Sequence, residues 1–184
     1  AALPDIAFDG WVWDVIIKAA IEQGHTEQTA RAVFPEKITS VLDAFADMID
    51  RNMLNKLESI SIENMRIRDR IQMAVFERFK ILNTYKEAER KALQYWIFPT
   101  RKLRAGKILW RSADRIWNWA GDTATDYNHY TKRTLLSGVI AATTLAWLND
   151  HDVDLHQTQE FLERRIDNVL LFGKTINTIK SKFS

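Results

Sequence analysis

The sequence predicts an all-helical protein, and three observations lead to this prediction. The chain of 184 residues contains only 6 glycines and 3 prolines, too few turn-forming residues for a sandwich or barrel of many strands. Apolar residues recur three and four positions apart along most of the chain, as they do on one face of an amphipathic helix. No segment alternates apolar and polar residues well enough to predict a strand.

The composition indicates a globular chain that can bury a real core. Hydrophobic residues make up 46% of the chain and charged residues 27%. Cysteine is absent, which excludes disulfides, thiolate metal sites and cysteine nucleophiles and suits a reducing, cytosolic setting. The first four residues, Ala-Ala-Leu-Pro, resemble neither a signal peptide nor an Arg-rich transit peptide.

Three helices are predicted near the start of the chain. Residues 10–23 form the first, and Gly24 ends it. Thr26 caps a short second helix that ends at Pro35, and Glu36 begins the third. The apolar stripe of this third helix consists of Ile38, Val41, Leu42, Phe45, Met48, Ile49 and Met53.

Further helices follow in the middle of the chain. Ser61 is expected to cap the next one, residues 85–98 form a helix that stops before Pro99, and residues 107–120 form another that is dense in aromatics. One face of the helix after Ser61 carries Ile67, Ile71, Ala74, Val75, Arg78 and Leu82.

Two more helices complete the prediction. Asp122 or Thr123 is expected to cap a long helix that runs through Leu148. Asp154 is expected to cap the last helix, which Gly173 interrupts before a short tail.

The middle of the long helix carries sixteen consecutive residues without a charge, residues 134–149. A membrane-spanning helix needs about 20 mostly apolar residues. This segment is shorter and includes Thr134, Ser137 and Asn149. We therefore expect a helix buried on most sides, in the middle of a bundle or at a homodimer interface.

Charge is distributed unevenly along the chain. The net charge is only +2, yet residues 66–107 contain twelve Lys or Arg and four Asp or Glu. Such a basic middle suits an anionic membrane or nucleic acid, and it is also typical of an ordinary solvated helix surface.

The first three helices have the lengths of a helix-turn-helix unit. DNA contact requires cations that bind phosphate. Residues 26–53 carry three Lys or Arg and five Asp or Glu, so their net charge is −2. We therefore expect the three helices to have a structural role in the fold, and we do not expect them to bind DNA.

The sequence predicts neither a metal nor an organic cofactor. Glu22-x-x-His25 and Asp126-x-x-His129 have the spacing of one half of a di-iron site, which needs two such pairs and two further carboxylates. His25 follows a glycine, where the helix is expected to end. Residues 152–156, an acidic loop with a His, are interpreted as a helix start. No serine lies in a nucleophile elbow and no Gly-rich phosphate loop occurs, so we expect no catalysis.

The seven tryptophans are the unusual feature of the composition. Aromatic rings beside cations line pockets for amphiphiles or lie at membrane surfaces, although filling the core is the commonest role of a single Trp. The aromatic and basic cluster comprises Trp96, Trp110, Trp117 and Trp119 with Arg101, Lys102, Arg104, Lys107, Arg111 and Arg115.

Residues 116–136, IWNWAGDTATDYNHYTKRTLL, resemble the signature of the ubiquinone (coenzyme Q) biosynthesis accessory protein family. Residues 161–166, FLERRI, resemble a second segment of that family, and Gly10-Trp11 resembles its start. The matching signature residues are Gly121, Asp122, Thr125, Asp126, Asn128, Tyr130, Thr131, Lys132 and Arg133.

The resemblance implies a TetR-like helical bundle that pairs into homodimers without binding DNA. It implies an N-terminal helix-turn-helix-like triplet, residues 1–57, and a larger lipid-binding and dimerisation domain, residues 58–184. Members bind isoprenoid and other lipids, associate with membranes, and present a quinone intermediate to a di-iron demethoxyubiquinone hydroxylase. The signature is the family's partner-facing patch.

Two sets of site residues follow from the aromatic cluster and the resemblance. The expected lipid-binding residues are Trp96, Phe98, Trp110, Trp117, Leu135 and Val139. The expected partner-binding residues are Asp126, Asn128, His129 and Tyr130.

Two departures from the family pattern affect the expected partners. The family commonly has Trp where this chain has His129, which suggests a remodelled partner contact. Members often carry a C-terminal amphipathic membrane helix, and here residues 174–184 form only a short basic amphipathic segment.

The function predicted from the sequence is a non-catalytic, lipid-binding accessory protein of ubiquinone biosynthesis. Its expected ligand is an isoprenoid quinone or a phospholipid. Its expected place is the cytoplasm, with peripheral attachment to the inner membrane. The alternative is a TetR-type transcriptional regulator with an apolar effector.

Overall fold

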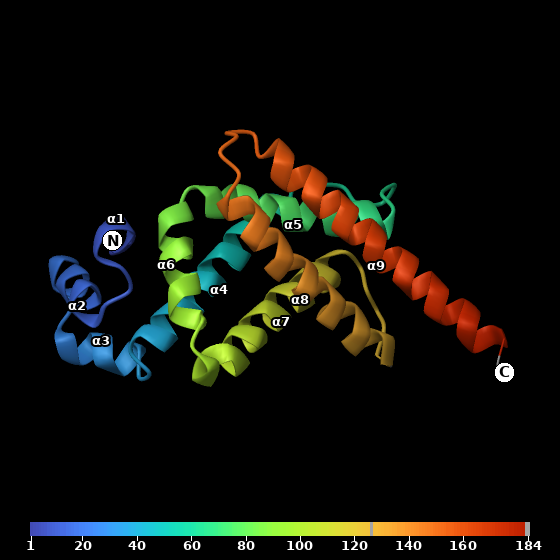
Figure 1. The fold of residues 1–184 in the computed structure, drawn as a ribbon. Helices are drawn as coiled ribbons and strands as arrows, with labels where there is room; N and C mark the ends of the chain where they lie inside the picture. The colour runs from blue at the N-terminus through green and yellow to red at the C-terminus, as the bar shows by residue number, and fades with distance from the viewer. Residues whose placement is uncertain (126, 183–184) are drawn as a thin grey trace.

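A computed structural model describes residues 1–125 and 127–182, with side chains as far as residue 169. This part of the chain contains helices and no strands, so the all-helical prediction is confirmed (Figure 1). The helices are α1 Leu3–Asp9, α2 Trp13–Glu22, α3 Glu27–Val33, α4 Ile38–Leu57, α5 Ile67–Asn83, α6 Lys86–Trp96, the short 3₁₀ helix η1 Pro99–Arg101, α7 Lys102–Trp119, α8 Tyr127–Leu148 and α9 His156–Lys182.

The N-terminal triplet lies at one end of the molecule and differs from the prediction at its start (Figure 1). The expected helix of residues 10–23 is observed as α2, which begins at Trp13, and α1 before it was not predicted. Gly10, whose φ is 81°, separates the two helices. Trp11 in this break is buried, and its Nε1 donates a hydrogen bond to the carbonyl of Ala88 at 2.8 Å. The capping prediction for Thr26 is confirmed, because its Oγ1 accepts from the Thr29 amide at 3.1 Å.

The core lies where α4, α5, α7 and α8 meet. Most of the predicted α4 stripe is buried, although α4 begins at Ile38 because Lys37 has a φ of 48°. Trp147 of α8 is fully buried and contacts Phe79 of α5 with ring centroids 5.7 Å apart. The uncharged segment therefore lies in the core for most of its circumference, with Leu145 exposed.

Two predicted helix caps and one predicted break are wrong. Ser61 does not cap α5, which begins after Arg66 without a side-chain cap. Neither Asp122 nor Thr123 caps α8, because α8 begins at Tyr127. Gly173 lies inside α9 and does not interrupt it.

The start of α9 is capped by earlier aspartates and not by Asp154. The Asp152 carboxylate accepts from the His156 amide at 3.2 Å. The Asp150 carboxylate, which is buried, accepts from the amide and the hydroxyl of Thr158 at 2.8 and 2.7 Å. Burial alone would raise the pKa of Asp150, yet these hydrogen bonds hold it below its ordinary value.

Many cations of the basic middle are directed toward other helices. They form ion pairs and hydrogen bonds that join helices far apart in the sequence, so this region is not a continuous free cationic surface. These contacts join Arg68 to Asp167 at 2.6 Å, Arg70 to the Ala120 carbonyl at 2.9 Å, Arg78 to Asp50 at 3.0 Å, Arg90 to the Leu148 carbonyl at 2.9 Å, and Arg104 to Asp43 at 2.7 Å.

Helix α4 also contacts both α5 and α7, so the triplet joins the larger bundle through a shared helix. The predicted domain boundary after residue 57 coincides with the end of α4 and stays a prediction. Among the described residues, none of the helices combines the length and the hydropathy needed to cross a bilayer.

Candidate functional site

A largely apolar pocket lies where side chains of α4, α5, α6, α7 and α8 converge. Its volume is about 210 Å³. An apolar cavity of about 150 Å³ is large enough for a benzene ring, whereas drug-sized ligands occupy roughly 300–1,000 Å³. As it stands, the pocket fits a ring-sized group and not a whole polyprenyl chain. Its lining residues are Leu42, Phe45, Ala46, Arg78, Glu89, Ala92, Leu93, Trp96, Ala105, Ile108, Leu109, Ala141, Thr144 and Leu145.

Glu89 places a carboxyl group in this apolar lining. No described side chain forms a hydrogen bond or an ion pair with it. Burial raises the pKa of the Glu89 carboxyl, the Arg78 guanidinium partly opposes this shift, and the Asp50 carboxylate adds to it. The pocket therefore presents a half-buried carboxyl group that has no hydrogen-bond partner among the described side chains.

Arg78, the other charged residue of the lining, is paired with Asp50. It is buried, and its Nε donates to Asp50 Oδ1 at 3.0 Å. The other oxygen of Asp50 accepts from the Ser112 hydroxyl at 2.7 Å and from Arg115 at 3.5 Å. Arg78 therefore acts on Glu89 through its charge, without a hydrogen bond between the two side chains.

Only one of the six predicted lipid-binding residues lines the pocket, namely Trp96 of α6. Phe98 is exposed, with Arg101 over its ring at 4.9 Å. Leu135 and Val139 line an open groove between α8 and α9. The predicted set is therefore distributed over several surfaces instead of forming one site.

The remaining two, both tryptophans of α7, lie near the start of α8. Trp110 stacks on Tyr130, with centroids 6.1 Å apart and planes at 30°. Trp117 donates from Nε1 to the Lys132 carbonyl at 3.2 Å, and the Lys132 ammonium lies 5.3 Å from its ring centroid. Both rings help to position α7 against α8.

The signature residues divide into two groups, one of which faces inward. Arg133 is 1% exposed, and its guanidinium donates to Asp114 at 2.5 Å, to Asp122 at 3.0 Å and to the Asn118 side chain at 3.0 Å. We call these four residues the Arg133 cluster. The cluster joins α7, the loop after it and α8, so this half of the signature determines the geometry of the hairpin.

Lys132 completes the environment of the Asp122 carboxylate, to which its Nζ donates at 2.7 Å. Burial alone would raise the pKa of Asp122. Hydrogen bonds from Lys132 and Arg133 outweigh that effect and hold the pKa below its ordinary value. Asp122 therefore stays a carboxylate at neutral pH and pairs with both cations.

The other group of signature residues faces outward and includes the predicted partner-binding set. Tyr130 and Asn128 are exposed, while His129 is half-buried with Nδ1 3.0 Å from the Ala124 carbonyl. Tyr130 packs between Trp110 and the edge of His129. Asp126 lies outside the described residues.

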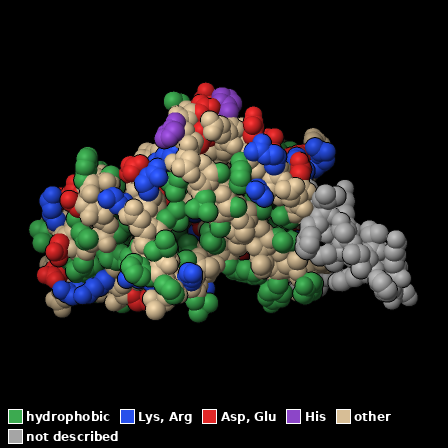
Figure 2. Space-filling model, in the orientation of Figure 1, with side chains coloured by type: hydrophobic (Ala, Val, Ile, Leu, Met, Phe, Trp, Pro, Cys, Tyr) green, Lys and Arg blue, Asp and Glu red, His purple; other side chains and the backbone are tan. Residues whose placement is uncertain are grey.

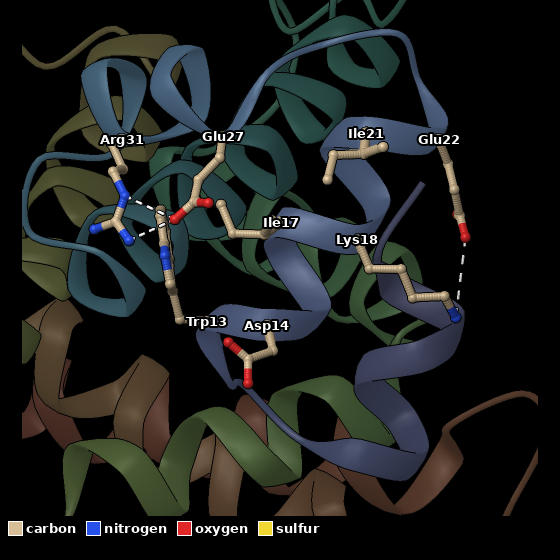
Figure 3. A pocket seen from close by; sticks show the side chains of 8 residues that line it. All are labelled: Trp13, Asp14, Ile17, Lys18, Ile21, Glu22, Glu27 and Arg31. Atoms are coloured by element: carbon tan, nitrogen blue, oxygen red, sulfur yellow. Dashed lines mark hydrogen bonds and ion pairs between the residues drawn. The ribbon is translucent and has the colours of Figure 1, made fainter.

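A shallow groove lies between α2 and α3, two helices of the N-terminal triplet that resembles a helix-turn-helix unit (Figure 3). Its walls include Trp13, Ile17 and Ile21. Arg31 is directed back to Glu27 at 2.5 Å instead of projecting outward, as Figure 3 shows. This pairing leaves the groove without the free cations that bind phosphate.

The acidic loop places Asp152, Asp154 and His156 within 4.8 Å of one another. Asp152 accepts hydrogen bonds from the backbone amides of Asp154 and His156, and its carboxylate also contacts the His156 ring. The sequence interpretation as a helix start accounts for this geometry.

The sequence analysis missed Glu89, Arg78 as a pocket residue, and Asp50. A signal for them exists in the helical periodicity. Arg78 shares one face with buried apolar residues of α5, and Asp50 follows Ile49 on the buried side of α4. A charge in phase with an apolar stripe predicts a buried polar contact, but it does not identify the partner.

Comparison with known proteins supports the resemblance that the signature indicated. The family model described as COQ9 matches residues 103–173. The ubiquinone biosynthesis protein COQ9, mitochondrial, of Rattus norvegicus is 27% identical over 98% of this chain and 60% of that protein. Its Homo sapiens counterpart is 26% identical over 98% of this chain and 59% of that protein. The chain thus spans about three fifths of the length of these curated relatives.

A solved structure shows the same fold. The crystal structure of a TetR transcriptional regulator from Nitrosomonas europaea ATCC 19718 matches with a TM-score of 0.70 and 18% identity. The match covers 92% of this chain and 94% of that one. The TetR-like architecture expected from the resemblance is therefore confirmed.

Proposed function

From its similarity to COQ9 proteins, we propose that the chain is a non-catalytic accessory protein of ubiquinone biosynthesis that binds isoprenoid or quinone intermediates. One observation supports the ligand-binding part of this proposal, namely the largely apolar pocket that five helices line, with Trp96 of α6 among its residues. Apolar pockets with few polar groups are the usual form of small-molecule sites. The ring of a quinone or its precursor occupies the pocket, and its tail leaves along the surface.

The polar groups in the described part of the chain support a binding role without catalysis. Asp50 pairs with Arg78 and accepts a hydrogen bond from the Ser112 hydroxyl, and Asp122 is paired with Lys132 and Arg133. General acid–base catalysis needs a titratable group within reach of the reacting atom and a second group that orients it. Glu89 has no such second group among the described side chains.

A pair of neighbouring substitutions on α8 tests the pocket. Ala141 lines the pocket, whereas Ala142 lines the groove between α8 and α9. We expect A141F to abolish binding of a polyprenylated quinone in a calorimetric titration, and A142F to leave it within about threefold. Lipid mass spectrometry of the purified protein provides an independent readout. Equal binding by both variants would place the ligand elsewhere.

We propose that the turn between α6 and α7 attaches the protein peripherally to the inner membrane. Ile97 and Leu103 are 72% and 76% exposed, and Lys102 lies between them without an acidic residue in the turn. Figure 2 shows hydrophobic side chains with Lys or Arg along the lower edge of the molecule, where this turn lies in Figure 1. Apolar side chains beside cations favour an anionic bilayer surface.

Vesicle sedimentation tests this attachment. The variant I97Q/L103Q is expected to lose most of its binding to vesicles that contain phosphatidylglycerol. The control V153Q removes an apolar side chain that is 87% exposed in the loop before α9, away from the turn. Unchanged sedimentation of I97Q/L103Q would remove the turn from the proposal.

We propose that the outward half of the signature contacts a demethoxyubiquinone hydroxylase-like enzyme. The stacked pair of Tyr130 and Trp110 supplies exposed aromatic area, which is typical of protein interfaces. Y130A is expected to weaken the complex at least tenfold in a binding titration, with Y95F as a matched control away from the signature. A homodimer is the other expected assembly, and its test is the molar mass in sedimentation equilibrium.

A TetR-type regulator with an apolar effector is the alternative, and the structural neighbour supports it at the level of the fold. This alternative requires salt-sensitive binding to duplex DNA. The pairing of Arg31 with Glu27 argues against it. Retardation of genomic duplex fragments at low salt, reversed by added salt, would favour the regulator.

A further inference from the structure

Among the described residues of the pocket region, Glu89 is the half-buried carboxyl group that receives no hydrogen bond from another side chain. Asp43 and Asp47 receive hydrogen bonds from Arg111 and Arg115, and Asp50 receives one from Arg78. Glu89 receives none from the described side chains, although its helix face carries the buried Ala88 and Ala92. The Glu89 carboxyl group, which has no partner among the described side chains, lies in the pocket that is proposed to bind the ligand.

A polar group in an apolar pocket determines which ligands bind, because leaving it unpaired in the complex is unfavourable. The positive charge of Arg78 in the same lining, only partly offset by Asp50, opposes a cationic ligand. An anionic ligand is disfavoured by Glu89 itself. A neutral hydroxyl group suits the site, because a carboxyl oxygen accepts its hydrogen bond whether Glu89 is ionised or protonated.

We propose that Glu89 accepts a hydrogen bond from a hydroxyl group of the ligand, so that the pocket selects apolar molecules with a hydroxylated ring over their ether counterparts. This inference rests on the proposed function, because it assigns the chemistry of the same pocket. The ring lies among Phe45, Trp96 and Ile108, and the hydroxyl points to Glu89 from α6. The volume of about 210 Å³ agrees with a ring-sized group.

A matched pair of probes tests the selection, namely 4-pentylphenol and its methyl ether, 4-pentylanisole. The two molecules share ring and tail, and only the phenol donates a hydrogen bond. We expect calorimetric titration to show that the full chain binds the phenol at least about tenfold more tightly than the ether, as a hydrogen bond to a charged group implies.

Two variants assign the preference to Glu89. E89L keeps the size of the side chain and removes the acceptor, so it is expected to bind both probes with equal affinity. E87L is the control, because Glu87 lies on the same helix, is exposed and pairs with Arg90 at 3.4 Å. E87L is expected to keep the tenfold preference.

Three outcomes would overturn the inference, and they separate it from the proposed function. Equal binding of both probes by the unmodified chain would remove the role of Glu89 and leave an apolar pocket intact. A preference that persists in E89L would assign the selection to another residue. Binding of neither probe, together with no binding of a polyprenylated quinone, would remove the pocket and the proposed function at once.

Discussion

The Arg133 cluster and the pocket around Glu89 show two ways in which this protein handles a charge directed into its interior. Arg133 is 1% exposed and donates to three side chains and to the His129 carbonyl. Glu89 lines a pocket and has no described partner. A charged side chain whose hydrogen bonds are all made holds helices in place. A charged side chain without such partners beside a cavity is available to a ligand.

The signature in residues 116–136 also contains both paired and exposed side chains. Lys132 and Arg133 bind Asp122 and determine the loop between α7 and α8. Tyr130, three residues before Arg133, is 62% exposed and stacks on Trp110. One motif therefore combines residues that hold the fold with residues that are available to a partner. Substitutions can test the two roles separately.

The largest expected effect is the loss of Arg133. R133M leaves Lys132 as the one cation paired with Asp122 among the described side chains, and it removes the contacts to Asp114 and Asn118. Removing one partner of a buried ion pair destabilises by about 3–5 kcal/mol. Urea unfolding followed by circular dichroism measures the free energy of unfolding. A loss below about 1 kcal/mol would contradict the structural role of the cluster.

Replacing Glu89 is expected to raise the free energy of unfolding, whereas R133M lowers it. Burial raises the pKa of the Glu89 carboxyl, so over a range above its unfolded-state value the folded chain holds a proton that the unfolded chain has lost. The free energy of unfolding therefore falls as pH rises through this range. E89Q removes this titration and is expected to be roughly 1–3 kcal/mol more stable than the unmodified chain above the folded-state pKa.

The pH dependence provides the control for that variant. Below the unfolded-state pKa both states carry a protonated Glu89, so the advantage of E89Q is expected to disappear in acid. Urea unfolding at several pH values measures the difference. A difference that does not change with pH, or a variant less stable than the unmodified chain at neutral pH, would show that Glu89 has a partner after all.

The smallest expected effect is that of Lys132, whose side chain is 38% exposed and shares Asp122 with Arg133. Exposed ion pairs contribute only about 0–1 kcal/mol, because solvent screens them. K132M is therefore expected to lower the free energy of unfolding by about 1 kcal/mol or less. A loss as large as that of R133M would mean that both cations belong to one indivisible cluster.

Much of the fold was predictable from local patterns. The stripe of α4, the cap at Thr26 and the end of α2 near Gly24 depend on neighbouring residues only, and the structure confirms them. The signature also predicted the TetR-like fold. Helix α1 was not predicted, and the start of the next helix was placed at Gly10 instead of Trp13, because Trp11 fits its apolar periodicity. The Trp11 indole packs instead toward Ala88, far along the chain.

The candidate site was less predictable, because the lipid-binding set was chosen by residue type. Trp96 lines the pocket, while Phe98 is exposed and Leu135 and Val139 line a separate groove. The reason is that aromatic character does not indicate the direction of a side chain. Direction depends on which helices pack together, and Glu89 gave no aromatic signal at all.

The sequence by itself determined the all-helical class, most of the apolar helix faces and the family resemblance carried by residues 116–136. Helical periodicity and capping are local, so these features follow from residues a few positions apart. Only the tertiary structure decided which charges are saturated. Arg78 meets Asp50 across 28 positions, Arg111 meets Asp43 across 68, and Glu89 meets no described partner. Pairing between distant helices depends on how they pack, and that packing separates a structural charge from one left for a ligand.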